Sequence, residues 1–391
     1  MPEPFSIVCV SPQEWHVDLP TNRQQIMVRA ARRGHTVLFV ETGGFLGRAV
    51  WRLLRHRDRA ALAGLFRPVE VAPNVLLRRA LNVLPWGHTH PFPSAVNGRL
   101  TALALRRTVR SLPQPAILWL YDPCAAGLVG SCGERFAVYD CVDDYAEQTG
   151  ASVLKRQLAE SADREAASKA SIVFATASPL FERHRKLNSQ THLVPNVGDF
   201  QHFAAAADRE LAPPELRALP RPVLGFAGNL MASKVDFRLL EALADAYPSA
   251  TLLLVGPVRP DAQGFLDRVL LRRNVRWVGP KTYAELPSYV AAFDVGLIPY
   301  VSNAYTRSCF PLKLYEYLAA GKPVVASGLP ELRGREPDVV VAEGDEFIAA
   351  VGAARELCSL SDRERRMATA ARNTWDVRTE RLLALVAQEL G

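Results

Sequence analysis

Short apolar runs alternate with amphipathic stretches along the whole chain, which is the pattern of strands and helices following one another. In the first half, the expected elements are strands at residues 5–10, 36–41, 115–122, 136–144 and 171–178 and helices at residues 21–35 and 151–170. Thr21 and Gln24 have the spacing of a capping box at the start of the first helix. Regular alternation predicts an α/β fold with parallel, doubly wound sheets.

The second half continues the alternation. Residues 221–243, RPVLGFAGNLMASKVDFRLLEAL, read as an apolar strand, a glycine turn and an amphipathic helix. Residues 274–300 read as two strands flanking a helix that begins near Tyr283. A chain of 391 residues is too long for one ordinary core, so two domains are expected. The alanine- and proline-rich residues 204–222 predict the linker between them.

Residues 311–325, PLKLYEYLAAGKPVV, predict a short helix followed by a buried strand. Pro311 suits the first helical turn, and Gly321 suits the left-handed position after the last turn. At about 100° per residue, one helix face carries Lys313, Glu316, Tyr317 and Ala320, and the opposite face is apolar. We therefore expect one face to pack and the other to bind a ligand.

That polar face is suited to a nucleotide diphosphate. Free N–H groups at the helix start would attract phosphate, Lys313 would add a point charge, and Glu316 could accept hydrogen bonds from both ribose hydroxyls. The alternative is a surface Lys/Glu pair, worth only a few tenths of a kcal/mol, by the usual effect of such pairs on a helix.

The segments 221–243 and 311–325 together resemble the donor-binding signature of GT-B glycosyltransferases of the family 4, or group 1, type. The Pro-x-Lys-x-x-Glu-Tyr form that begins at Pro311 resembles a subgroup of cell-surface polysaccharide assembly, such as the teichuronic-acid type. This resemblance implies two Rossmann-like domains facing across a cleft. The expected bounds are an acceptor-binding domain at 1–205, a nucleotide-sugar domain at 206–372 and a terminal helix at 373–391 that crosses back.

The resemblance also implies which residues bind the donor. They are Gly228, Asn229, Lys234, Gly279, Lys281, Ser308, Pro311, Leu312, Lys313 and Glu316. Gly279 to Lys281 would line the base pocket, and Lys234 would contact phosphate. Two positions depart from the family pattern, because Asn229 replaces an arginine and Ser308 replaces the first of two glutamates. An ordinary turn with a solvated lysine is the alternative for Lys234.

Candidate catalytic residues follow strands of the first half. Asp143 and Asp144 could act as a base toward the acceptor hydroxyl, or could instead cap the helix that begins near Tyr145. His16 lies in the loop after the first strand and could contact the donor sugar, or could simply be solvated. No Asp-x-Asp triplet occurs, so metal-independent transfer is expected. The family resemblance implies retention of anomeric configuration, and the missing glutamate leaves an inverting route open.

Charge and cysteines refine this interpretation. The formal charge is +7, and residues 48–68 form the densest basic tract, which could contact anionic lipid or be a solvated arginine-rich helix. Nucleic-acid binding is disfavoured, because no aromatic residues interleave with the charge. The six cysteines show no C-x-x-C spacing and are interpreted as reduced thiols rather than metal ligands. No apolar run approaches transmembrane length, so the expected location is the cytoplasm, with peripheral contact at the membrane.

The functional expectation is a glycosyltransferase that moves a sugar from a UDP-linked donor to a glycan or lipid-linked glycan in cell-surface polysaccharide synthesis. No cofactor is expected beyond this nucleotide-sugar substrate. Two alternatives stay open. One is a sugar-nucleotide epimerase of the same fold, and the other is a nucleotide- or glycan-binding module that has lost activity.

Overall fold

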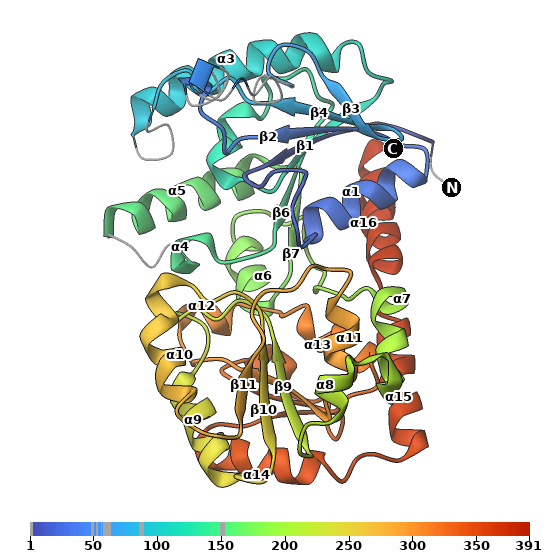
Figure 1. The fold of residues 1–391 in the computed structure, drawn as a ribbon. Coiled ribbons are helices and arrows are strands. Elements are labelled where there is room, and N and C mark those ends of the chain that lie inside the picture. The colour runs from blue at the N-terminus through green and yellow to red at the C-terminus, as the bar shows by residue number, and fades with distance from the viewer. Residues whose placement is uncertain are drawn as a thin grey trace. The chain divides into compact units, whose positions relative to one another are not determined.

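The structure is a computed structural model that describes residues 3–47, 51, 54–55, 57, 64–85, 90–148 and 153–391. It divides into two compact units (Figure 1). The first contains residues Met1–Pro195 together with Arg378–Gly391, and the second contains Asn196–Val377. Each unit is built around one parallel sheet, as the alternating sequence pattern predicts.

The first unit contains an eight-stranded sheet in the order β3-β4-β2-β1-β5-β6-β7-β8. Its strands are β1 (Ser6–Ser11), β2 (Thr36–Glu41), β3 (Val69–Ala72), β4 (Val75–Arg79), β5 (Ala116–Leu120), β6 (Ala137–Cys141), β7 (Ile172–Ala175) and β8 (Thr191–Leu193). All neighbours are parallel except β3 and β4. The central strands are buried along their whole length, because helices lie on both faces (Figure 1).

The predicted helices at residues 21–35 and 151–170 are present in the first unit, whereas those at Pro91–Val109, Pro123–Leu128 and Ser178–His184 were not predicted. The helices of this unit are α1 (Asn22–Arg32), α3 (Pro91–Val109), the 3₁₀ turn η2 (Pro123–Leu128), α4 (Tyr145–Gln148), α5 (Val153–Lys169), α6 (Ser178–His184) and most of α16 (Trp375–Leu390). The predicted capping box is present, since the backbone N–H of Thr21 donates to Oε1 of Gln24 at 3.1 Å.

The second unit contains a six-stranded, all-parallel sheet in the order β11-β10-β9-β12-β13-β14. Its strands are β9 (Val223–Ala227), β10 (Thr251–Val255), β11 (Val275–Trp277), β12 (Val295–Pro299), β13 (Val324–Ser327) and β14 (Val339–Val341). Numbered from β9, this is the 3-2-1-4-5-6 order of the doubly wound dinucleotide-binding fold. The order reverses between β9 and β12, and ligands of such sheets bind outside the carboxyl ends of the strands at that point.

Helices of the second unit lie on both faces of its sheet (Figure 1). They are α7 (Phe200–Phe203), α8 (Pro214–Arg217), α9 (Phe237–Ala246), α10 (Gln263–Val269), α11 (Leu286–Ala291), α12 (Ala304–Arg307), α13 (Lys313–Ala319), α14 (Gly344–Ala354) and α15 (Leu360–Ala371). Short 3₁₀ turns add η3 (Ala204–Ala207), η4 (Arg209–Leu211), η5 (Pro260–Ala262) and η6 (Pro330–Leu332).

The division between the units lies ten residues before the predicted boundary at 205, and the terminal segment joins the first unit from Arg378 rather than from residue 373. The predicted linker, residues 204–222, contains three short helices. Phe203, Ala206, Ala212 and Leu216 are buried in the core of the second unit. Alanine and proline serve there as small packing residues and helix starts, so composition alone misidentified this segment as a linker.

Candidate functional site

The site begins where β9 and β12 lie side by side. Gly225 pairs with Gly296 across these two strands, and the loops that follow them begin at Gly228 and Tyr300. These loops are joined, because Val235 forms a β-bridge with Tyr300. The chain that leaves β12 then forms α12 and α13, so Lys313 lies in the region where the sheet order reverses.

Lys313 lies directly over the backbone of Gly228. A Cβ atom added at Gly228 would stand 2.2 Å from Cε and 2.7 Å from Nζ of Lys313. Gly256, at the end of β10, has φ +135°, and an added Cβ there would stand 2.1 Å from the carbonyl oxygen of Gly228. The backbones of Gly228 and Gly256, which carry no side chains, therefore meet close to the ammonium group of Lys313. This arrangement lets a phosphate approach the backbone and a cation together.

Glu316 lies one helical turn after Lys313 and is partly exposed. Burial raises the pKa of its carboxyl group, while the charges of Lys313 and His202 act to lower it and that of Asp199 acts to raise it. Among the described residues, no side chain donates a hydrogen bond to this carboxylate. It is therefore available to accept hydrogen bonds from a ligand.

Two residues that sequence analysis did not select, His202 and Asp199, lie close enough to Glu316 for their charges to act on it. Tyr283 contacts both of them. The ring of His202 stacks on the ring of Tyr283 at 4.1 Å, and Nε2 of His202 donates to the carbonyl oxygen of Tyr283 at 2.8 Å. Asp199 accepts the Tyr283 hydroxyl at 3.3 Å and caps α7 through the N–H of His202. These contacts link two segments about 80 residues apart, so no local pattern in the sequence indicated them.

The remaining predicted donor residues are distributed around this centre. Nζ of Lys234 lies 5.0 Å from the ring of Tyr300 and 5.1 Å from that of Tyr305. Nζ of Lys281 lies 4.7 Å from the ring of Tyr289. Lys234 thus lies close to two aromatic rings, whereas Nζ of Lys313 lies 6.0 Å from one ring, that of Phe226.

Backbone positions also fall near the sheet edge. Gly279 has φ +73°, and its carbonyl oxygen accepts the N–H of Gly256 at 2.8 Å. Asn229 is exposed, whereas Ser308 is buried at the end of α12. Pro311 and Leu312 directly precede α13, and Gly321 has the expected left-handed φ of +69°.

The predicted binding face of α13 was wrong for two of its four residues. Tyr317 is fully buried, and its hydroxyl accepts the backbone N–H of Ala227 at 2.8 Å. Ala320 is buried as well. The helix packs against the sheet over a wider arc than the pattern indicated, so only Lys313 and Glu316 of that face stay partly exposed.

Trp277 and Asp294 of the second unit have structural contacts. Nε1 of Trp277 donates to the carbonyl oxygen of Gly256 at 2.9 Å, and its ring packs against the core of the second unit. Asp294 accepts the N–H of Val223 at 2.7 Å and pairs with Arg221. Asp294 thus closes the turn before β12.

In the first unit, Asp143 and Asp144 have different surroundings. Asp144 is buried, accepts the N–H of Glu147 at the start of α4, and forms an ion pair with Arg183. Asp143 is partly exposed, and its charge contributes to raising the pKa of the buried Arg23. His16 is exposed in the loop after β1. Capping therefore accounts for Asp144, while Asp143 and His16 have the access that contact with a substrate needs.

Substitution tests this division of roles. We expect Asp144→Ala to lower the free energy of unfolding by about 1–3 kcal/mol, because it removes a helix cap and the closer of the two carboxylates paired with Arg183. Asp143→Ala, the matched variant one residue away, should change stability by about 0.5 kcal/mol or less, as partly exposed positions do. Urea unfolding followed by circular dichroism measures both. Equal losses in the two variants would contradict the assignment.

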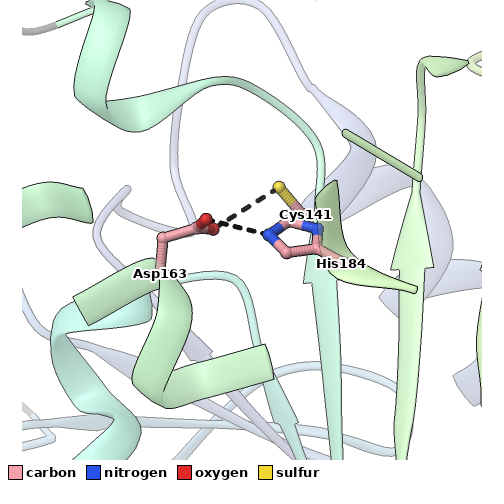
Figure 2. Close-up of side chains that lie close together, drawn as sticks. All are labelled: Cys141, Asp163 and His184. Atoms are coloured by element: carbon pink, nitrogen blue, oxygen red, sulfur yellow. Dashed lines mark hydrogen bonds and ion pairs between the residues drawn. The ribbon is translucent and has the colours of Figure 1, made fainter. Parts of the chain in front are cut away.

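Cys141, Asp163 and His184 form a buried cluster from β6, α5 and α6 (Figure 2). Nε2 of His184 lies 2.8 Å from Oδ2 of Asp163, and Sγ of Cys141 lies 3.9 Å from Oδ1. Tyr139 donates to Oδ1 of Asp163 at 2.6 Å. Burial acts to raise the pKa of Asp163, but the hydrogen bonds from His184 and Tyr139 outweigh it and lower that pKa.

These three side chains are ligand types that bind zinc, although the sequence spacing of the cysteines gave no such signal. A closed structural zinc site takes four ligands, and here three candidate ligand atoms lie within 4.8 Å of one another. Both oxygens of Asp163 already accept hydrogen bonds, and burial keeps the pKa of Cys141 well above its ordinary value. The cluster fits a hydrogen-bonded core network better than a metal site.

The basic tract at 48–68 lies only partly within the described residues. Arg48, Arg52 and Arg59 fall outside them, whereas Trp51, Leu54 and Phe66 are described and exposed. Within the described ranges, no helix is both long and apolar enough to span a membrane.

The fold and the site define the class of protein. The structure resembles, with a TM-score of 0.73 and 17% identity, sucrose-phosphate synthase from Thermosynechococcus elongatus, covering 99% of each chain. It resembles Anabaena Alr3699/HepE, solved in complex with UDP, with a TM-score of 0.69, 14% identity and coverage of 98% of this chain and 100% of that one. Each unit is an α/β domain built around a largely parallel sheet. Together with these structural neighbours, this architecture identifies the GT-B glycosyltransferase fold, as the sequence predicted.

The second unit also matches a family model. Residues 221–358 match the model described as Glycosyl transferases group 1. The chain is also 33% identical over 230 residues to the Bacillus subtilis (strain 168) protein described as "Putative teichuronic acid biosynthesis glycosyltransferase TuaH". That match covers 54% of this chain and 57% of the relative, so it spans little more than half of each.

Proposed function

We propose that the protein is a glycosyltransferase that transfers a sugar from a UDP-linked donor to a glycan or lipid-linked glycan. The observation that carries this proposal is the placement of Lys313 over Gly228 at the point where the sheet order reverses, within the segment that matches the family model. The HepE structures in complex with UDP and with UDP-glucose favour uracil as the base.

In the proposed reaction, the bond between the anomeric carbon and the β-phosphate oxygen breaks, and the acceptor hydroxyl oxygen bonds to that carbon and loses its proton. Lys313, which lies over the side-chain-free backbone of Gly228, stabilises the negative charge that develops on the diphosphate. This electrostatic role needs no metal, and we propose that anomeric configuration is retained. Asp143 and His16 are the first-unit residues proposed to contact the reacting groups.

The relationship to TuaH favours an acceptor in cell-surface polysaccharide synthesis over the epimerase alternative. An epimerase would use the donor alone, whereas a transferase needs the large acceptor that such pathways supply. A catalytically inactive module would bind the donor without turnover.

Calorimetric titration with UDP, GDP, ADP and NAD in metal-free buffer tests the donor class. We expect UDP to bind more tightly than the other three nucleotides. Slow release of UDP from UDP-sugars in the absence of acceptor would then support an enzyme. Preference for another base would overturn the UDP assignment, and UDP binding without any turnover would support the inactive module.

A further inference from the structure

A polar cavity of about 450 Å³ lies at the amino ends of the strands of the second unit's sheet. Its lining includes Pro222, Asp294 and Pro323, which immediately precede β9, β12 and β13. Lys313 and Gly228 lie instead near the carboxyl ends of the strands, so this cavity is separate from the proposed nucleotide site. No part of the proposed transfer reaction uses it.

The cavity lining is strongly basic. It includes six cationic side chains and two carboxylates: Arg209, Arg221, Lys322, Arg355, Arg363 and Arg366, with Asp294 and Glu356. Asp294 is already paired with Arg221. Positive charge therefore exceeds negative charge around this partly open cavity, and a bound anion would offset the repulsion between the cations.

Backbone carbonyl groups hold several of these cations in place. Lys322 donates from Nζ to the carbonyl oxygen of Ala291 at 3.1 Å, and Arg363 donates to that of Ala207. Arg366 donates to the carbonyl oxygens of Gly321 and Leu357, both at 2.9 Å. A carbonyl orients a cation without cancelling its charge. Only Arg366 has an acidic neighbour in addition, since one of its nitrogens lies 3.4 Å from Asp338.

Lys322 is the group that responds to this excess charge. Burial, and after it the like charges of Arg363, Arg209 and Arg366, lower the pKa of Lys322 to about 7. Those charges come from η4 and α15, and the Arg221–Asp294 pair, Arg355 and Glu356 line the same volume. A bound anion would offset the repulsion and favour the protonated lysine, so binding should take up protons near neutral pH.

We propose that this cavity is a second anion site, which binds the phosphate group of a small phosphorylated compound. Three cations from separate segments would contact the phosphate oxygens: Arg209 of η4, Lys322 of the turn before β13 and Arg363 of α15. The volume lies within the range of pockets that bind small molecules, about 300–1,000 Å³, so it can hold the group esterified to the phosphate as well. The same chemistry would recognise a phospholipid headgroup, and the test below separates the two sources.

Pyrophosphate titration of the full chain tests the site, because this probe supplies the phosphate oxygens without a base. The double variant Lys322→Met/Arg209→Gln should weaken pyrophosphate binding about tenfold or more, as loss of charged contacts does. Lys313→Ala is the matched control at the nucleotide site and should change the pyrophosphate affinity of the cavity by about twofold or less. The single variant Lys322→Met is measured as well, in case the double variant does not fold. The thermal unfolding midpoint without ligand shows whether each variant is folded.

Comparing the loss of pyrophosphate affinity in the two variants distinguishes a failure of the cavity proposal from a failure of the proposed function, on which it does not depend. If Lys313→Ala abolishes pyrophosphate binding while the double variant retains it, the cavity proposal fails and the nucleotide site alone binds anions. No pyrophosphate binding to the wild-type protein also overturns it. Glycerol phosphate in solution and phosphatidic acid in vesicles are then compared, and stronger competition by the vesicles would overturn the small-molecule assignment.

The pH dependence gives an independent readout. Sulfate keeps a constant charge between about pH 6 and pH 8.5, so any change in its affinity reports on the protein. Because Lys322 loses its proton as pH rises through about 7, sulfate binding should weaken over this range. Lys322→Met should remove the dependence. A pH-dependent affinity that survives in this variant would contradict the role of Lys322.

Discussion

Lys313→Ala is expected to weaken UDP binding by about 1.5–3 kcal/mol, the range for losing a hydrogen bond to a charged group. The affinity for uridine, which lacks phosphate, should hardly change. The reason is geometric, because the ammonium group lies over a backbone that has no side chain at Gly228 or Gly256. Calorimetry with the two ligands measures the difference directly.

Gly228→Ala gives an independent test without removing charge. Its Cβ would collide with Cε of Lys313, whose flexible end can swing away, and would stand 3.2 Å from Cζ of the buried Phe226, which must shift by a few tenths of an ångström. We expect a UDP affinity close to that of Lys313→Ala and a small fall in the unfolding midpoint. Arg273→Ala, an exposed substitution in the same unit, is the control. A loss of uridine affinity equal to the loss for UDP would refute the phosphate contact.

Glu316→Gln should weaken the binding of UDP and of uridine alike, by about 1–3 kcal/mol each, because both ligands carry the ribose. A carboxylate can accept hydrogen bonds from two hydroxyls at once, whereas an amide offers only one oxygen as an acceptor. With 2′-deoxy-UDP, wild type and variant should differ less, since one of the two donors is already missing. If Glu316→Gln loses as much affinity for the deoxy ligand as for UDP, the 2′-hydroxyl contact is excluded.

The pH dependence follows from the raised pKa of Glu316. Only the ionised carboxylate accepts both hydroxyl protons, so affinity should fall as pH decreases through this pKa. Because burial raises the pKa, the loss should begin at a higher pH than for an ordinary glutamate. Uridine is the ligand for this measurement, since it has no phosphate that titrates in the acidic range. An affinity for uridine that is constant through the acidic range would argue against ionised Glu316 as the acceptor.

Local signals in the sequence were sufficient for the strands and for the limits of α13. Apolar runs marked the strands because strands buried on both faces leave no polar positions, and Gly321 marked the helix end because it needs positive φ. The exposed arc of α13 was not predictable from periodicity, since Tyr317 carries a polar atom that the structure satisfies inside the core.

Residues brought together from distant segments were beyond such signals. His202 and Tyr283 stack across about 80 residues, and Cys141, Asp163 and His184 meet only after three elements have packed. Asp143 and Asp144 are neighbours in sequence, yet one is partly exposed and the other is buried against Arg183. Which adjacent carboxylate turns inward depends on tertiary packing, which no local pattern encodes.

The paired glycines of β9 and β12 carry a consequence for the evolution of this fold. A Cβ at Gly225 would overlap the ring of Phe293, and a Cβ at Gly296 would overlap the ring of Tyr317. The two rings themselves meet edge to face at 5.9 Å. Neither glycine can therefore be replaced by a larger residue alone. In related sequences, a larger residue at either position should occur together with a smaller residue at the position of its aromatic partner. The two positions of each pair should therefore covary beneath the nucleotide site.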